Sequence, residues 1–186
     1  MSQTILIVLG LTILSIIILY NNLVAARQRV REGASDVETQ LKRRYDLIPN
    51  LIETVKGYAK HEKETLEKVV EARSAAMNIQ SLGEQKSAAE NMLSDTLKSI
   101  FALSENYPKL QANENFLELQ QELADTENKI QASRRFYNST VLALNTKIET
   151  FPGIFIAKIF GFTPEKFFEL SDSERQTAQE RPKVSF

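Results

Sequence analysis

A long uncharged segment at the start of the chain constrains its fold more than any other feature. The residues from Thr4 to Tyr20 include no charged side chain. An α-helix needs about 20 apolar residues to cross the hydrocarbon core of a bilayer, with about 17 as the lower limit. We therefore predict that residues 1–24 form a transmembrane anchor, with residues 4–24 in contact with lipid. A cleaved signal peptide is the alternative, but Met1–Gln3 lacks the Lys or Arg that would favour it.

The basic residues beside this segment predict its orientation. No Lys or Arg precedes it, whereas Arg27, Arg29 and Arg31 follow within a dozen positions. Because cytoplasmic flanks of membrane spans are enriched in Lys and Arg, the N-terminus is expected outside and the rest of the chain in the cytoplasm. We thus expect a single-pass protein of the cell's inner (cytoplasmic) membrane.

Residues 25–150 have the apolar periodicity of long helices, with steps of three, four and seven positions. Gly (6) and Pro (5) are too scarce for the many turns of a β-sandwich or barrel. We therefore predict an all-α fold, with an antiparallel four-helix bundle behind the anchor. Pro49 disfavours helical geometry at the residue before it and suits the first turn of a new helix. The first helix is thus expected to end near Tyr45–Pro49, and the others to run from Pro49 to Gln80, from Gly83 to Asn106 and from Asn113 to Phe151.

Residues 151–170 form a second apolar segment. Because four long helices alternate in direction, this segment is expected to return close to the bilayer surface. It either lies at the membrane interface or folds back to cover an end of the bundle, and the sequence favours neither. The candidate membrane contacts are Ile154, Phe155, Ile159, Phe160 and Phe162. Residues 171–186 are polar and are predicted to be a disordered tail.

The sequence contains none of the residue arrangements that mark an active site. The chain has no Cys and a single histidine, His61, which lies in a charged stretch and lacks a Glu three positions before it. A transition-metal site or a nucleophile paired with a base is therefore not expected. The neighbouring glutamates alternate with lysines, as in solvent-facing ion pairs. We predict a protein that is not an enzyme and needs no cofactor or metal, and the net charge of -1 argues against nucleic-acid binding.

Polar and charged groups among the apolar positions are candidates for contacts with partners. A rigid helix would carry Lys42–Arg44 about 35 Å from the bilayer, beyond the reach of a lipid headgroup. Complementarity to the dipole at a helix C-terminus explains these cations best, and a protein partner is the alternative. Amides on the later helices either fix the register between helices or line an oligomer contact. The candidate partner or assembly contacts are Lys42, Arg43, Arg44, Tyr45, Asp46, Asn50, Asn115 and Asn128.

Three motifs resemble those of a known family. The stretches Gln40–Leu51, Ala112–Gln120 and Phe160–Phe162 are similar to the signature of the bacterial LemA family, although Ala34 and Leu144 depart from its usual pattern. The resemblance implies a single-span membrane protein with a helical bundle and no established enzymatic activity. Family members often occur beside HtpX-like membrane zinc metalloproteases, and a relative functions in building magnetosome membranes.

The resemblance and the residues together indicate a function. We expect a scaffold or adaptor that forms homo-oligomers and recruits a membrane partner, such as an HtpX-like metalloprotease in membrane protein quality control. The alternative is a membrane-shaping protein in which the bundle ends and residues Ile154–Phe162 act on lipid.

Overall fold

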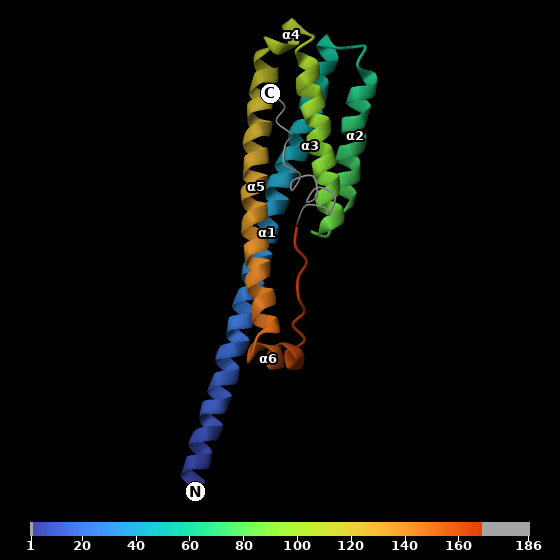
Figure 1. Cartoon of the computed structure of the whole chain (residues 1–186). Coiled ribbons are helices and arrows are strands. Elements are labelled where there is room, and N and C mark those ends of the chain that lie inside the picture. Colours follow the sequence, from blue (N-terminus) through green and yellow to red (C-terminus); the bar gives the residue numbers. More distant parts are fainter. Residues whose placement is uncertain (1, 169–186) are drawn as a thin grey trace, which may run out of the picture.

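The computed structural model describes residues 2–168 and confirms the all-α class, since these residues contain helices and no strand. Helix α1 spans Ser2–Tyr58 and is 57 residues long. Its apolar first part projects alone from one end of the molecule (Figure 1). The remaining helices are α2 (Lys63–Asn78), α3 (Glu84–Ser104), α4 (Pro108–Gln111), α5 (Glu114–Glu149) and α6 (Gly153–Phe160). The predicted disordered tail, 171–186, lies outside the described residues.

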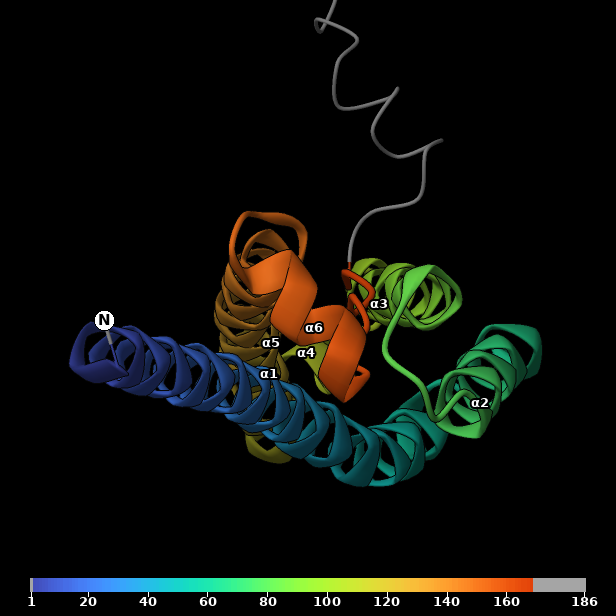
Figure 2. The same ribbon diagram turned by 90° about the horizontal axis from the view of Figure 1, so that it is seen from below.

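The long helices pack as two pairs. Helix α1 lies along α5, and α2 lies along α3 (Figures 1 and 2). We call the packed part, from Leu23 of α1 through α2–α6, the helical body. Helices α1 and α5 approach each other closely at Gly33, where a Cβ atom would lie 3.0 Å from the Cα of Tyr137. A side chain at this position would therefore require the backbone of α5 to shift.

Helix α1 does not end at Pro49, and the predicted boundary there is wrong. Pro49 lies inside α1, which continues to Tyr58, and the turn to α2 follows only then. A proline in a helix leaves the carbonyl four residues earlier without its backbone donor. That carbonyl belongs to Tyr45, and it accepts a hydrogen bond from Nε of Arg73 in α2 at 3.0 Å. A side chain from another helix thus replaces the missing backbone bond.

Other predicted boundaries agree more closely with the structure. Asn113 caps α5 as expected, because its side chain accepts a hydrogen bond from the backbone N–H of Phe116. Helix α3 begins directly after Gly83 and ends at Ser104, two residues before the predicted position. The short helix α4, which starts at Pro108, was not predicted.

The segment after α5 returns along the helical body. Helix α6 lies across the end of the body from which the apolar part of α1 projects (Figures 1 and 2). Gly161, in the left-handed conformation (φ 70°), then reverses the chain. Residues 163–168 run back without regular secondary structure, and their backbone is held by Asn138 and Asn145 of α5.

Candidate functional site

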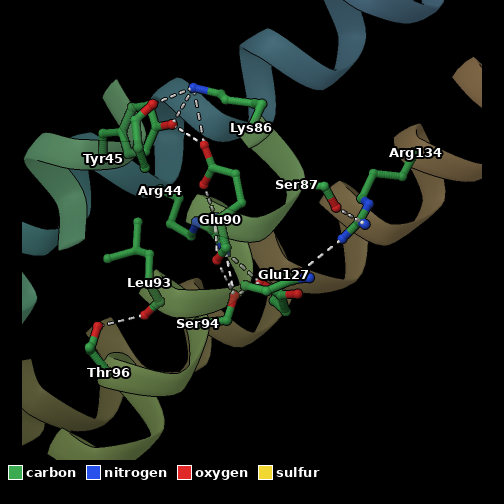
Figure 3. A network of polar contacts seen from close by, with 12 residues as sticks. Arg44, Tyr45, Lys86, Ser87, Glu90, Leu93, Ser94, Thr96, Glu127 and Arg134 are labelled. Carbon is green, nitrogen blue, oxygen red and sulfur yellow. Dashed lines mark hydrogen bonds and ion pairs between the residues drawn. The ribbon is translucent and has the colours of Figure 1, made fainter. Parts of the chain in front are cut away.

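Arg44 lies at the centre of a buried network of charged groups (Figure 3). Its side chain is 2% exposed and forms an ion pair with Glu90 of α3, which is equally buried. Its Nη1 donates to Oε2 of Glu127 in α5 and to Oγ of Ser94, each at 2.8 Å. One guanidinium therefore joins α1, α3 and α5.

Tyr45 and Lys86 complete the network around Glu90. The Tyr45 hydroxyl donates to Oε1 of Glu90 and accepts a hydrogen bond from Nζ of Lys86 at 2.9 Å. Nζ of Lys86 also donates to the carbonyl oxygen of Ala76 at 2.7 Å and lies 3.2 Å from Glu90. Burial, reinforced by the hydrogen bond to Glu90, raises the pKa of Tyr45 well above its usual value. Tyr45 thus remains a protonated donor throughout the physiological range.

Arg134 makes a parallel set of contacts from α5. It donates to Oγ of Ser87 at 2.7 Å and to Oδ1 of Asn91 at 3.3 Å. Its guanidinium also lies 4.7 Å from the ring centroid of Phe168, which is fully buried. Arg134 therefore connects α3 to the returning segment 163–168.

A signal for this network is present in the sequence. Arg44 occupies the helical position between Leu41 and Ile48, both of which are buried. Lys86 and Glu90 likewise continue the buried stripe of α3 that includes Leu93, Leu97 and Ile100. Charged residues at core positions of neighbouring helices indicate mutual pairing, because a buried charge requires a partner.

The candidate assembly contacts divide into buried and exposed groups. Arg44 and Tyr45 are 1% and 8% exposed, so assigning them to a contact surface was wrong. The helix-dipole explanation for Lys42–Arg44 was also wrong, because α1 continues well beyond them. The other candidates have exposed side chains: Lys42, Arg43, Asp46, Asn50, Asn115 and Asn128.

These exposed residues are not all neighbours. Nη1 of Arg43 in α1 lies 3.9 Å from Oδ2 of Asp125 in α5. Asn128 is one helical turn from Asp125, so the exposed residues near Arg43 and Asn128 lie at the same height along the helical body. Asn115 lies in the first turn of α5, at the opposite end of that helix from α6.

Two amides on α5 bind backbone instead of side chains from other helices. Asn145 donates through Nδ2 to the Glu165 carbonyl and accepts from the Glu165 N–H, both at 2.9 Å. Asn138 forms the same pair of bonds with Phe168, at 3.0 and 2.8 Å. The Tyr137 hydroxyl adds a bond to the Lys166 carbonyl at 2.9 Å. These side chains hold the extended segment against α5.

Helix α6 has one buried and one exposed apolar face. Ile156 and Ala157 pack into the body, whereas Phe155, Ile159 and Phe160 are 58%, 74% and 50% exposed. Ile154 is half-buried. The buried face covers an end of the body, as one of the two predicted alternatives requires. The exposed face is available to lie at the membrane interface, which is the other predicted alternative.

Phe162 does not belong to the exposed face. Its side chain is 8% exposed, with its ring centroid 5.9 Å from that of Tyr20 and 4.8 Å from the Arg27 guanidinium. The expectation that Phe162 contacts the membrane was therefore wrong, because the ring packs against α1. Phe160 also packs against Tyr20, at a centroid distance of 4.8 Å, but remains half exposed.

The chemistry available in residues 2–168 is limited. No cluster of three or more histidine, aspartate or glutamate side chains in this range could hold a metal ion. His61 is exposed. A cavity of about 330 Å³ lies between α3 and α5. Among its lining residues, Arg44 and Glu127 pair with each other, and so do Asp95 and Lys98. These four charges are therefore paired within the protein.

The length and exposure of α1 define the class of this protein. Within the described part of the chain, α1 is the helix long and apolar enough to cross a membrane, and its apolar window is not buried in the protein. The class is therefore a membrane-associated all-α protein with a helical body behind an exposed apolar helix. Residues 33–186 match the LemA family, and the chain belongs to that family.

Curated relatives agree with this assignment. The chain is 26% identical to Protein LemA of Metamycoplasma hominis over 155 residues, which cover 83% of this chain and 71% of that protein. It is 21% identical to Magnetosome protein MamQ 2 of Paramagnetospirillum magneticum over 182 residues, covering 84% of this chain and 67% of the relative. A MamQ of Magnetospirillum gryphiswaldense is also 21% identical, over 84% of this chain and 66% of its own length. None of these names is that of an enzyme, which favours a non-enzymatic protein.

Proposed function

We propose that this protein is a non-enzymatic, membrane-anchored scaffold or adaptor that self-associates and recruits a membrane partner. The anchor crosses the inner membrane once, with the helical body in the cytoplasm. An HtpX-like zinc metalloprotease is the partner class that we put forward. The continuity of α1 carries the proposal, because one helix runs from the apolar segment through the length of the body.

A rigid connection is what a scaffold requires. The Arg44 network joins α1 to α3 and α5, so the height and rotation of the body follow those of the anchor. Its buried charges pair with one another, which leaves recognition to the surface. Exposed polar residues such as Asn50 and Asn128 are the surface candidates for specific contacts.

The mass of the full-length protein in mild detergent tests self-association. Light scattering is expected to give a discrete mass above that of one chain, and co-purification from membranes is expected to retain the metalloprotease. Asn128→Arg should lower the mass by adding bulk and charge at an assembly contact. Asn78→Arg, at an exposed amide in the last turn of α2, is the matched control and should leave the mass unchanged. A monomer that captures no membrane protein would refute the scaffold.

A second candidate function is the shaping of lipid membranes. The exposed Phe155 and Phe160 of α6 favour it, because apolar side chains that enter one leaflet expand that leaflet. Vesicles containing the full-length protein should then deform at high protein density, as seen by electron microscopy. Replacing Phe155 and Phe160 by Asp should abolish the deformation. Vesicles that stay spherical at every density would exclude this function.

A further inference from the structure

Helix α6 carries an apolar surface that the helical body does not cover. Phe155 and Ile159 of α6, and Phe151 in the turn before it, follow one another at intervals of four residues and are 58%, 74% and 80% exposed. We infer that α6 lies in the interface of the bilayer, with these three side chains inserted among the lipid chains. The inference rests on the membrane span of the proposed function. It does not depend on self-association or on the shaping of lipid.

Contacts with Tyr20 fix the depth of α6. The apolar run from Thr4 to Tyr20 is about 25 Å long at a helical rise of 1.5 Å per residue, slightly less than the roughly 30 Å of a hydrocarbon core. Tyr20 therefore lies near the edge of that core, followed by the polar Asn21 and Asn22. Because the Phe160 ring packs 4.8 Å from the Tyr20 ring, α6 lies at the same depth.

The orientation of α6 directs its exposed face toward the bilayer. The helix crosses the end of the body from which α1 projects, and in the view from that end it lies in front of α3, α4 and α5 (Figure 2). Its packing is tight, because a Cβ atom on Gly153 would lie 2.0 Å from the Lys147 carbonyl oxygen. Ile156 and Ala157 face the body, so the opposite side of α6 faces away from it.

The composition around α6 suits a lipid interface. Lys158 is the only charged residue of the helix and is exposed, so its ammonium can reach the headgroups while its stem stays among apolar groups. Lys147 and the arginines at positions 27, 29 and 31 lie at the same end of the body, against Glu32 and Glu149. This excess of positive charge favours anionic headgroups. An aromatic ring such as that of Tyr20 at this depth is also typical of membrane proteins.

Fluorescence can test the depth directly, because the chain contains no Trp. The full-length Phe155→Trp variant would be reconstituted at low protein density into vesicles of phosphatidylcholine and phosphatidylglycerol, with or without bromine on the lipid chains near the headgroup. We expect a blue-shifted emission, a loss of intensity in the brominated vesicles and protection from aqueous iodide. When Ile159→Asp is added to Phe155→Trp, the blue shift, the quenching by brominated lipid and the protection from iodide should all be smaller.

Leu117→Trp is the matched control. Leu117 is 48% exposed on α5, at the end remote from α6, and its emission should be quenched by iodide and not by bromine. If Phe155→Trp behaves like this control, the inference is wrong. If its emission is blue-shifted but insensitive to bromine, protein covers α6 and the inference is again wrong. A monomeric mass in detergent would refute the scaffold without changing either fluorescence result.

Discussion

Arg73 of α2 donates its Nε–H to the backbone carbonyl oxygen of Tyr45 in α1 at 3.0 Å. That carbonyl is the one that Pro49 leaves without a backbone donor. A side chain from the following helix thus allows α1 to continue through a proline. The bond also fixes α2 against the segment of α1 that holds the Arg44 network.

Arg73→Met should therefore destabilise the protein by about 1.5–3 kcal/mol, the usual range for a hydrogen bond to a charged group. In a Pro49→Ala background the same change should cost less, because the introduced alanine would supply the backbone N–H. Pro49→Ala alone should stabilise the protein by up to about 3 kcal/mol. Denaturation of the four variants in mild detergent measures the coupling. An equal cost of Arg73→Met in both backgrounds would contradict the explanation.

Arg44 and its neighbour Arg43 provide a matched comparison of buried and exposed charge. Arg44→Met leaves Glu90 and Glu127 without their shared cation and should cost about 3–5 kcal/mol. Arg43→Met removes an exposed cation 3.9 Å from Asp125 and should cost less than about 1 kcal/mol. Both values come from denaturant unfolding followed by circular dichroism. Similar costs for the two variants would mean that the network does not stabilise the fold.

Gly33 should not tolerate a large side chain. Gly33→Leu forces α1 and α5 apart at Tyr137 and should destabilise the body by about 1–3 kcal/mol. Gly57→Ala is the control, because a Cβ atom there meets nothing within 4 Å. Its effect should be neutral, or stabilising by up to about 1 kcal/mol from helix propensity. Thermal unfolding of both variants distinguishes close packing from a general effect of replacing glycine.

Stability should fall at alkaline pH because of two tyrosines. Burial raises the pKa of Tyr45, with help from its bond to Glu90, and burial together with the charge of Glu165 raises that of Tyr137. Their folded pKa values exceed the unfolded value of about 10, so their contribution is fully present below pH 10. Above pH 10 the unfolded chain loses these protons first, and stability should decrease by up to about 1.4 kcal/mol per pH unit for each tyrosine.

Urea unfolding between pH 8 and 11.5 measures this loss. Tyr45→Phe should be less stable at pH 8, because it removes the donor to Glu90 and the acceptor for Lys86. Above pH 10 its stability should fall less steeply than that of the unmodified protein. If stability falls as steeply with pH in Tyr45→Phe as in the unmodified protein, the pKa of Tyr45 is the same in the folded and unfolded states.

The sequence predicts the helices well because apolar spacing is a local signal. The caps, the apolar stripes and the exposed apolar segment of α1 depend on residues within a few turns of each other, as the Asn113 cap of α5 illustrates. The path through Pro49 was missed because it depends on Arg73, which only the folded chain brings to Tyr45. A proline rule based on neighbouring residues cannot include that contact.

The candidate site was harder to predict for the same reason. Arg44 was grouped with Lys42 and Arg43 because the three are consecutive, yet only Arg44 points into the body. Its environment is set by Glu90 and Glu127 on two other helices. Phe162 was grouped with Phe160 in the same way. The turn at Gly161 separates them, and Phe162 packs beneath Tyr20 and Arg27.

The spacing of Asn138 and Asn145 matches the segment that they hold. Seven helical residues rise about 10.5 Å, and three extended residues, as from Glu165 to Phe168, span about 10 Å. Replacing both asparagines by Ala should release residues 163–168 and cost about 1–2 kcal/mol per site. The N–H groups of Glu165 and Phe168, which donate to these side chains, should then lose protection from hydrogen exchange. Asn128→Ala, at an exposed amide of the same helix, should leave both protected. If the two amides stay protected without the asparagines, other contacts hold the segment, with Tyr137 and Arg134 as the next residues to replace.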